Sequence, residues 1–296
     1  MPSALPHKCH DDIADTGFCV IRNFLTPEEV TKYKAAAQKV IDYAREGKWP
    51  DVRTRGKQFP PWPKNFSPDI WGVSGLLHPD LGENGELSKP FHDLYACDKI
   101  LDVAGDILQQ PHDKLLMELF NMLINPLTDF GLDWHRDTIK PEVLPEEEAE
   151  QLLQDPYAGT QFNLALTEDP CLIVIPGSHK RVRTEEEREK TSNDNRKEFI
   201  TGQITVQLHP GDIVFYNNNI LHRAEYQAKN ERITVHGSYG LVDHGKLRAK
   251  GVLQHGVAKW LPRLELDNEN LNMLKGKLEA LAKEFEGVDL GYALDG

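Results

Sequence analysis

Short hydrophobic segments separated by turns fill the middle of the chain. The segments are rich in β-branched and aromatic residues, and Pro-Gly, Gly-Asp and Asn clusters lie between them. Within 203–208 the pattern has a period of two, with Ile204, Val206 and Leu208 on one face. Such a pattern is typical of an antiparallel barrel or jelly roll and not of alternating βα units. We therefore predict a mainly β fold with flanking helices, built on a double-stranded β-helix core over about 115–242.

Two helices are predicted before this core. Thr26-Pro27-Glu28-Glu29 combines a hydroxyl cap, a proline at the first helical position and a capping box, which predicts a helix over 26–45. The segment 17–25 before it is short and rich in β-formers, so we expect an edge strand that leads into this helix. Apolar residues near helical spacing predict a second amphipathic helix over 90–109.

The last helix is predicted over about 267–285, with Asp267 as its cap. One stripe of this helix carries four leucines, at 271, 274, 278 and 281. The stripe can pack on the core of the same chain or on a second copy. A homodimer is therefore compatible with the sequence.

The remaining segments are predicted to be loops or insertions in a single domain spanning 1–296. Residues 47–85 contain many prolines and aromatic residues, so we expect an ordered loop that packs its own aromatics or covers a pocket. Residues 145–156 and 183–197 are highly charged, and we expect solvated helical or flexible insertions there. A lid role for 47–85 and for 141–160 is open, and no internal repeat or low-complexity linker divides the chain.

Composition excludes several classes of partner. The chain has 296 residues with 34 Lys and Arg against 47 Asp and Glu, a net charge of −13, which disfavours nucleic acid and anionic membranes. The longest apolar run, 171–175, is far shorter than the roughly twenty residues that span a bilayer. Neither a signal peptide nor a C-x-x-C spacing is present, so we expect a cytoplasmic protein with four reduced cysteines that acts on a small-molecule substrate.

A metal site is the chemistry that the histidines favour. His135 and Asp137 are two residues apart and would point to the same face of a strand, and His222 ends a later strand-like segment. Two histidines and one carboxylate form a facial triad, which leaves three coordination positions free and suits non-haem Fe(II) chemistry. We therefore predict that His135, Asp137 and His222 are the metal ligands and the catalytic centre.

A co-substrate site is predicted from the arginine that follows. Arg232 opens the strand after His222, and a planar guanidinium binds a carboxylate through two hydrogen bonds. A 2-oxoglutarate held on iron by its keto-acid end projects its second carboxylate away from the metal. Arg232 is the predicted anchor of that carboxylate, and the hydroxyl of Thr234, on the same strand face, can add to it. Strand position also brings Asn121 and Gln161 near the site as candidate cofactor-binding residues.

The chain resembles the phytanoyl-CoA dioxygenase family of Fe(II)/2-oxoglutarate oxygenases. The resemblance is carried by GFCVIRNFLTPEEV, NMLINPLTDFGLDWHRD, CLIVIPGSHK and PGDIVFYNNNILHRAEYQAKNERITVHGSY. It implies a jelly-roll, cupin-like core, iron at His135, Asp137 and His222, and 2-oxoglutarate at Arg232. It also implies that O2 and 2-oxoglutarate are consumed, that succinate and CO2 form, and that a substrate C–H bond is oxidised, with hydroxylation as the expected outcome.

The chain also departs from the family pattern. Glu168-Asp169-Pro170 replaces the glycine usually found before the PGSH strand, and Asn217 to Asn219 form an unusual polar run. Neither departure falls on a ligand position, so both bear on the substrate and not on the cofactors. The resemblance assigns His179, in the PGSHK turn, a structural or pocket-edge role, and we expect a small free metabolite and not an acyl-CoA as substrate.

Two other functions were weighed. HRDTIKPE at His135 and the Asp129-Phe130-Gly131 string match protein-kinase motifs, but their order is reversed and the Gly-rich loop is missing. A cupin-like barrel can also hold a metal for isomerisation or hydrolysis, or serve as a metal-binding module. Arg232 separates this alternative from the oxygenase, because such a protein needs no guanidinium after the distal histidine.

Overall fold

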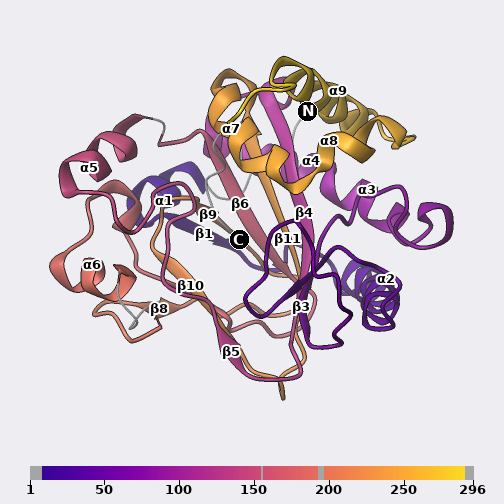
Figure 1. The fold of residues 1–296 in the computed structure, drawn as a ribbon, viewed down its shortest axis with the longest axis horizontal. Helices are drawn as coiled ribbons and strands as arrows, with labels where there is room; N and C mark the ends of the chain where they lie inside the picture. Colours follow the sequence, from indigo (N-terminus) through magenta and orange to yellow (C-terminus); the bar gives the residue numbers. More distant parts are fainter. Residues whose placement is uncertain (1–8, 155, 193–196, 291–296) are drawn as a thin grey trace.

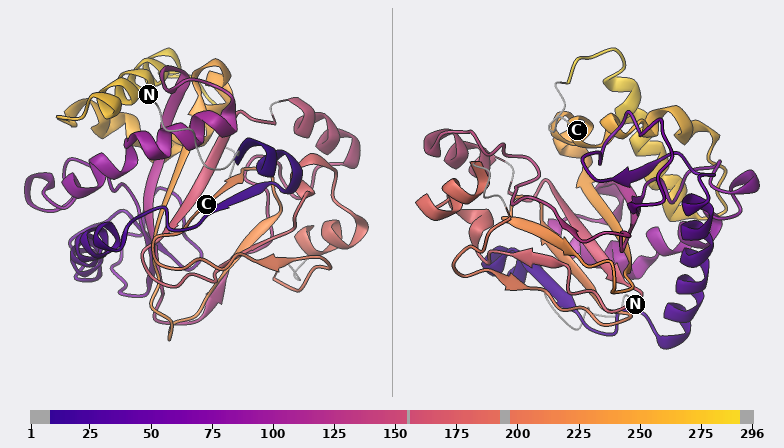
Figure 2. Two further views of the ribbon diagram at one scale, coloured as in Figure 1. Left: turned by 180° about the vertical axis from the view of Figure 1, so that it is seen from behind. Right: turned by 60° about the horizontal axis from the view of Figure 1, so that its bottom comes forward.

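The computed structural model describes residues 9–154, 156–192 and 197–290, which form two antiparallel sheets that face each other (Figures 1 and 2). The larger sheet has the order β1-β9-β6-β11-β4-β3-β2, and the smaller has the order β5-β10-β7-β8. The strands are β1 Phe18–Ile21, β2 Val52–Thr54, β3 Ile70–Val73, β4 Leu115–Ile124, β5 Phe130–Gly131, β6 Gly159–Ala165, β7 Leu172–Val174, β8 Ile204–Thr205, β9 Ile213–Asn217, β10 His222–Tyr226 and β11 Ile233–Leu241. The predicted jelly-roll class is confirmed.

Helices cover the outer face of the larger sheet (Figure 2). The α-helices are α1 Cys9–Thr16, α2 Pro27–Arg45, α3 Lys89–Tyr95, α4 Asp98–Leu108, α5 Pro145–Gln154, α6 Glu185–Ser192, α7 Gly245–Val252, α8 Val257–Trp260 and α9 Glu269–Glu284. Helix α2 contacts β3, α4 contacts β6 and α9 contacts β4. Their apolar faces and the outer face of the sheet together form the largest hydrophobic core. The inner face of the larger sheet is left to face the smaller sheet.

Several local predictions are confirmed by the structure. Strands β4 to β11 lie between Leu115 and Leu241, within the range predicted for the β core, but β1, β2 and β3, which come earlier in the chain, also belong to the larger sheet. Helix α2 has the predicted capping box, because the Thr26 hydroxyl accepts from the N–H of Glu29 while the Glu29 carboxylate accepts from the N–H of Thr26. Strand β1 is an edge strand of the larger sheet, as expected for 17–25.

The predicted helix over 90–109 is two helices, α3 and α4. The chain is extended at Cys97, between them, and the two helices pack on different neighbours: α3 on α2 and α9, and α4 on α1 and β6. Apolar residues lie at helical spacing on both sides of Cys97, so the sequence pattern did not reveal the break between the two helices. The last helix starts one residue later than predicted, because the side chain of Asn268, and not that of Asp267, accepts from the N–H of Leu271. Helices α1, α7 and α8 were not predicted.

The strand inferred from the alternation at 203–208 is much shorter than expected. Only Ile204 and Thr205 pair with β7, and Ile204 is exposed. Val206 and Leu208 are buried, as the alternation indicates, but Leu208 forms only an isolated bridge with Asp169. The period of two therefore identified two buried positions and overestimated the length of the strand.

The two charged insertions are helical where they are described, but they are not simply solvated; residues 155 and 193–196 lie outside the described part. Glu148 on α5 is fully buried and is ion-paired with three arginines. Its Oε1 lies 3.0 Å from Nε of both Arg136 and Arg183, and its Oε2 lies 2.6 Å from Nη2 of Arg188. On α6, Glu187 is also buried and forms two hydrogen bonds with Arg181. These ion pairs tie both insertions to the core.

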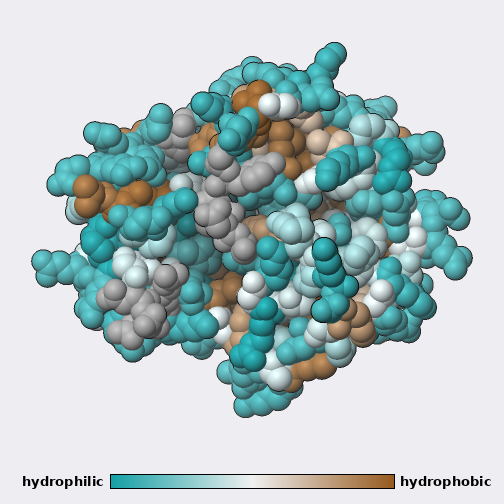
Figure 3. All heavy atoms as spheres, viewed as in Figure 1, coloured by the Kyte–Doolittle hydropathy of each residue, from teal (hydrophilic) through white to brown (hydrophobic). Residues whose placement is uncertain are grey.

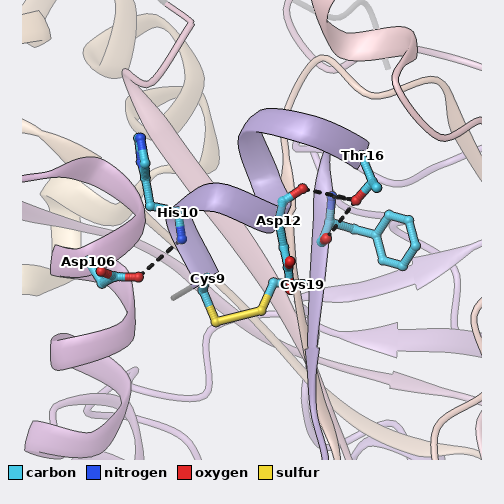
Figure 4. Close-up of a disulfide and its surroundings, with 7 residues drawn as sticks. Cys9, His10, Asp12, Thr16, Cys19 and Asp106 are labelled. Carbon is cyan, nitrogen blue, oxygen red and sulfur yellow. Dashed lines mark hydrogen bonds between the residues drawn. A yellow bond between two sulfur atoms is a disulfide. The ribbon is translucent and has the colours of Figure 1, made fainter. Parts of the chain in front are cut away.

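A disulfide between Cys9 and Cys19 joins α1 to β1 (Figure 4). The two Cα atoms are 5.5 Å apart, and the N–H of His10 in the same helix donates to the carboxylate of Asp106 on α4. The expectation of four reduced cysteines is therefore wrong for this pair. The ten-residue separation gave no C-x-x-C signal, and only the fold of α1 back onto β1 brings the two together. Cys97 and Cys171 are free thiols.

The surface of the protein is mostly hydrophilic, as its charge predicts. On the face shown in Figure 3, hydrophobic residues lie in separated groups among hydrophilic ones. The largest exposed apolar side chains include Leu144 and Leu153 near the two ends of α5. Among the described residues, no helix is long and apolar enough to cross a membrane. The cytoplasmic location stays a prediction.

Candidate metal centre and its cavity

Three predicted ligands converge at one end of the smaller sheet. His222 begins β10 and pairs with His135 through two backbone hydrogen bonds of 3.1 Å, and the N–H of Asp137 donates to the carbonyl of Asn218. Oδ1 of Asp137 lies 3.6 Å from Nε2 of His135 and 3.8 Å from Nε2 of His222. One ligand atom from each residue lies within 4.8 Å of the others, a separation that a single metal ion can bridge.

Both imidazoles present Nε2 to the common point because Nδ1 is already engaged. Nδ1 of His135 lies 2.7 Å from the carbonyl oxygen of Asp133, and Nδ1 of His222 lies 2.9 Å from that of Ile220. A carbonyl can only accept, so Nδ1 carries the proton in each neutral ring and Nε2 keeps its lone pair. Burial, and then the neighbouring His135, lower the pKa of His222 to about 4. The ring of His222 is therefore neutral at pH 7, as a metal ligand must be.

The second oxygen of Asp137 is held by the larger sheet. Nε2 of Gln161, on β6, donates to Oδ2 of Asp137 at 2.5 Å, and Nδ2 of Asn218 lies 3.5 Å from the same oxygen. Oδ1 is thereby oriented toward the two histidines. Gln161, predicted as a cofactor-binding residue, thus contacts a candidate ligand, and the structure gives it the role of orienting that ligand.

A cavity of about 870 Å³ lies between the two sheets and contains the triad. Segments around β2 and α7 complete its wall, and it is lined by side chains from both sheets. Eight Lys and Arg side chains but only three Asp and Glu side chains line it. The cavity is therefore basic although the whole chain carries a net charge of −13.

Arg232 and Thr234 lie in the same part of the structure, but both are bound to Asp169. Nε and Nη2 of Arg232 lie 3.1 and 3.0 Å from Oδ2 of Asp169, and the hydroxyl of Thr234 donates to the same oxygen at 2.6 Å. Burial alone would raise the pKa of Asp169, but Arg232 and Thr234 outweigh it and hold the pKa below its usual value. Nη1 of Arg232 is buried and has no hydrogen-bond partner among the described residues, so it remains available to an added acceptor.

Two other predicted residues do not line the cavity. Oδ1 of Asn121 accepts from the backbone N–H of Gly75, so this asparagine holds a loop next to β3. His179 is buried beneath Gly17 in the turn after β7, where a Cβ on that glycine would lie 2.6 Å from Nδ1 of His179. The structure thus favours the structural role for His179.

Sequence reasoning missed two residues that shape the site. Asp169 was noted only as a departure from the family pattern, and its contact with Arg232 depends on the meeting of the β6–β7 turn with β11. Arg53, on β2, lines the cavity and is 8% exposed. The sequence shows Arg53 only as one of several basic residues in a segment rich in proline and aromatic residues, which does not distinguish it from a surface arginine.

Comparisons with known proteins agree with this geometry. The family model described as Phytanoyl-CoA dioxygenase (PhyH) matches residues 13–228, which include the whole triad. The chain is similar to a probable phytanoyl-CoA dioxygenase of Caenorhabditis elegans, with 28% identity over 133 residues. That match covers 42% of this chain and only 41% of the length of the curated relative.

Solved structures share the fold at low sequence identity. AviO1 from Streptomyces viridochromogenes Tue57 has a TM-score of 0.54 and 19% identity, with coverage of 80% of this chain and 96% of that one. EctD from S. alaskensis, solved with 2-oxoglutarate and 5-hydroxyectoine, has a TM-score of 0.55 and 17% identity over 79% and 75% of the two chains. The carbocyclase SnoK from nogalamycin biosynthesis is described as non-heme and alpha-ketoglutarate-dependent. It has a TM-score of 0.54 and 20% identity, with coverage of 80% of this chain and 85% of that one.

Proposed function

The chain belongs to the phytanoyl-CoA dioxygenase family, and from that premise we propose that it is an Fe(II)- and 2-oxoglutarate-dependent oxygenase. Its reaction oxidises a C–H bond of a small organic molecule, with hydroxylation as the most direct outcome and succinate and CO2 as co-products. Neither nucleic acid nor a membrane is part of this reaction. The substrate occupies the cavity between the two sheets.

The observation that carries the proposal is the pairing of the triad with Arg232 in one cavity. The triad supplies two imidazole nitrogens and one carboxylate oxygen within 4.8 Å, a donor set that suits Fe(II). Nη1 of Arg232 is a buried donor without a partner among the described residues, as expected for a group that waits for a carboxylate. A metal-dependent isomerase or hydrolase would explain the triad but not this donor.

Each residue of the site has a defined task under this proposal. Iron together with 2-oxoglutarate and O2 supplies the oxidising chemistry when bound. His135 and His222 hold the metal through Nε2 while backbone carbonyls fix their rings, and Gln161 orients the Asp137 carboxylate. Asp169 fixes the direction of Arg232, so that Nη1 is the group left to bind the distal carboxylate of 2-oxoglutarate.

The proposal is tested by adding Fe(II) and then 2-oxoglutarate to the protein without oxygen. A weak visible charge-transfer band from the bidentate chelate is expected with the wild-type protein. His135→Ala should abolish it by removing the iron site, whereas His209→Ala should preserve it, because His209 is an exposed histidine paired with Glu168. A wild-type protein that binds iron but gives no band with 2-oxoglutarate would refute the oxygenase.

The role of Arg232 as the anchor of 2-oxoglutarate is tested in a protein that lacks the charge of Asp169. Removing Arg232 alone would leave the Asp169 carboxylate buried without a counter-charge, so Arg232→Ala is compared with its parent in Asp169→Asn protein. We expect 2-oxoglutarate to bind at least about tenfold more weakly after loss of Arg232, because a charge-assisted hydrogen bond is lost. Iron binding should be unchanged. Equal affinity of the two proteins for 2-oxoglutarate would remove Arg232 from the co-substrate site.

A further inference from the structure

Arg53 is a buried cation that forms no ion pair with any described residue. It is 8% exposed, and its Nε is buried with no hydrogen-bond partner. In the described part of the chain its side chain forms neither a hydrogen bond nor a salt bridge, and its Cζ lies 5.4 Å from the centre of the Trp71 ring. Burying an unpaired guanidinium is unfavourable, and burial lowers the pKa of Arg53. Such a group indicates that an acceptor is missing from the cavity.

The sheet directs this side chain into the cavity. Arg53 pairs with Gly72 on β3, and a Cβ at Gly72 would lie 2.9 Å from Cδ of Arg53. The absence of a side chain at Gly72 therefore lets the stem of Arg53 lie across the sheet. Gly72 is paired with Leu123, which is paired with Thr234, so the row that starts at Arg53 leads to the strand that begins after Arg232. Arg53 and the triad line the same cavity.

The acidic side chains of the cavity cannot serve as partners of Arg53. Glu118 is paired with Arg248, and Lys197 lies 3.8 Å from Asp133. Asp137 is directed to His135 and His222, and its other oxygen accepts from Gln161. An anion bound at Arg53 must therefore come from outside the described chain. The basic lining favours an anionic ligand in this cavity, although the whole chain carries a net charge of −13.

The two carboxylates of 2-oxoglutarate already have places under the proposed function. The keto-acid end belongs to the metal, and the distal carboxylate belongs to Nη1 of Arg232. Arg53 remains as a third position. We propose that Arg53 binds a carboxylate of the organic substrate, so that the substrate of this enzyme is a small organic acid. This inference rests on the proposed function, because it assigns the substrate of that same site.

The neighbours of Arg53 suit a single negative charge. Burial first, and then Arg53, lower the pKa of both His236 and His255 to about 3, so both rings are neutral at pH 7. Both rings line the cavity. The two rings add no charge, so the single positive charge of Arg53 matches a monoanionic carboxylate, which a planar guanidinium binds through two parallel hydrogen bonds.

The test uses hexanoate and its uncharged analogue hexanamide as probes. Their binding to the protein loaded with Fe(II) and 2-oxoglutarate is measured by anaerobic calorimetry, so that the metal and Arg232 are already occupied. Wild-type protein should prefer hexanoate by about tenfold or more, because the carboxylate gains a charge-assisted hydrogen bond. Arg53→Met should abolish this preference, and Arg53→Lys, which keeps the charge, should retain part of it.

Arg55→Met is the matched control. Arg55 also lines the cavity, two positions along the chain, but its guanidinium is hydrogen-bonded to Thr128 and to the carbonyl of Asp129. This variant should keep the preference for hexanoate, which separates a specific site from the general positive charge of the cavity. The thermal transition of Arg53→Met should be no lower than that of the wild type, since the substitution removes no side-chain hydrogen bond or ion pair within the described part of the chain.

Three results would overturn the proposal. These are equal binding of the two probes by the wild type, an unchanged preference in Arg53→Met, and a loss of 2-oxoglutarate affinity in Arg53→Met with hexanoate binding unchanged. The last result would assign Arg53 to the co-substrate. If the proposed function is wrong, the wild-type protein does not bind 2-oxoglutarate, which is a separate observation. In that case the binding of hexanoate and hexanamide can still be compared between the metal-free wild type and Arg53→Met.

Discussion

The segment from His135 to Asp137 has two sides that differ in how completely their buried charges are paired. Behind it, Arg136 extends into the ion network of Glu148, and its Nε, Nη1 and Nη2 all have acceptors. In front of it, the cavity contains donors without acceptors among the described residues, Nε of Arg53 and Nη1 of Arg232. Arg136, which enters the network, is adjacent in the sequence to both His135 and Asp137.

This difference separates a structural use of buried charge from a functional one. A buried network in which every member is paired fixes one arrangement of the chain, and here it locks α5, α6 and the metal-binding segment together. Unpaired donors in a cavity destabilise the empty protein and become useful only when a ligand arrives. The two sides therefore respond differently to substitution.

The largest expected effect is loss of the anion at the centre of the network. Glu148→Gln would leave the buried Arg136 and Arg183 and the partly buried Arg188 around a neutral amide. Breaking a buried ion pair by removing one partner costs about 3–5 kcal/mol, so we expect a loss of this size in the free energy of unfolding. Urea denaturation followed by circular dichroism measures it.

Glu147→Gln is the control for the network, because within the described residues the Glu147 carboxylate accepts a hydrogen bond only from Gln151, at an exposed position. A change of less than about 0.5 kcal/mol is expected there. If Glu148→Gln were equally mild, the network would not hold the insertions to the core, and the contrast between the two sides would disappear.

The second largest effect is expected on metal affinity. It tests whether hydrogen bonds on the cavity side fix the orientation of Asp137 as the ion network fixes that of Arg136. Gln161→Met removes the hydrogen bond to Oδ2 of Asp137. Loss of such a partner of a metal ligand typically lowers metal affinity by about 10–100-fold, and we expect a loss in this range in a Fe(II) competition titration. Asn163→Ala, on the same face of β6, affects the hydrogen bond with His236 and should leave metal affinity within about threefold. Equal effects of the two variants would show that the orientation of Asp137 does not depend on Gln161.

Local signals in the sequence predicted the elements and ligands that depend on few residues. The capping box at Thr26 predicted the start of α2, and the H-x-D spacing with the later His222 predicted three side chains that do converge. These features are specified by neighbours along the chain or by a period of two. The fold class followed from the same short-range alternation over 115–242.

Features that depend on a distant partner could not be predicted in this way. The glutamates of α5 and α6 have the composition of a solvated face, and only the arginines brought by other segments bury Glu148 and Glu187. Arg53 was missed for the opposite reason, because its importance lies in having no partner. The interaction of Asp169 with Arg232 joins positions 63 residues apart and reduces the donors that Arg232 can offer to 2-oxoglutarate.

The two sides should also lose stability in different ranges of pH. His255 has a pKa of about 3 in the folded protein, lowered first by burial, so only the unfolded chain binds its proton as the pH falls below 6.5. The contribution of His255 to the free energy of unfolding is complete above pH 6.5. It is lost between pH 6.5 and 3, at up to about 1.4 kcal/mol per pH unit. Burial would raise the pKa of Glu187, but Arg181 and the N–H of Thr184 outweigh it and hold it below 4.5, so its contribution is lost only below that pH.

Unfolding of the metal-free protein at several pH values measures this separation. His255→Gln should reduce the slope of the free energy of unfolding between about pH 6 and 4.5, at most by about 1.4 kcal/mol per pH unit. Glu187→Gln should change the slope only at lower pH. The slope of the free energy of unfolding between pH 6 and 4.5 could instead be the same in His255→Gln and in the wild type. That result would mean that His255 is protonated in the folded protein.

The smallest expected effect probes the unpaired cation itself. After burial, Arg53 is the next cause that lowers the pKa of His255, whose ring packs edge-on against Phe59 at 5.3 Å. Arg53→Met should therefore raise the pKa of His255 while leaving burial as the dominant cause, so the pKa stays below 6.5. NMR titration of the imidazole measures the shift. Binding of hexanoate to the wild type should raise the same pKa, because a bound carboxylate neutralises Arg53. An unchanged pKa in both experiments would show that the charge of Arg53 does not act on this wall of the cavity, and the two sides of the metal-binding segment would then differ only in hydrogen bonding.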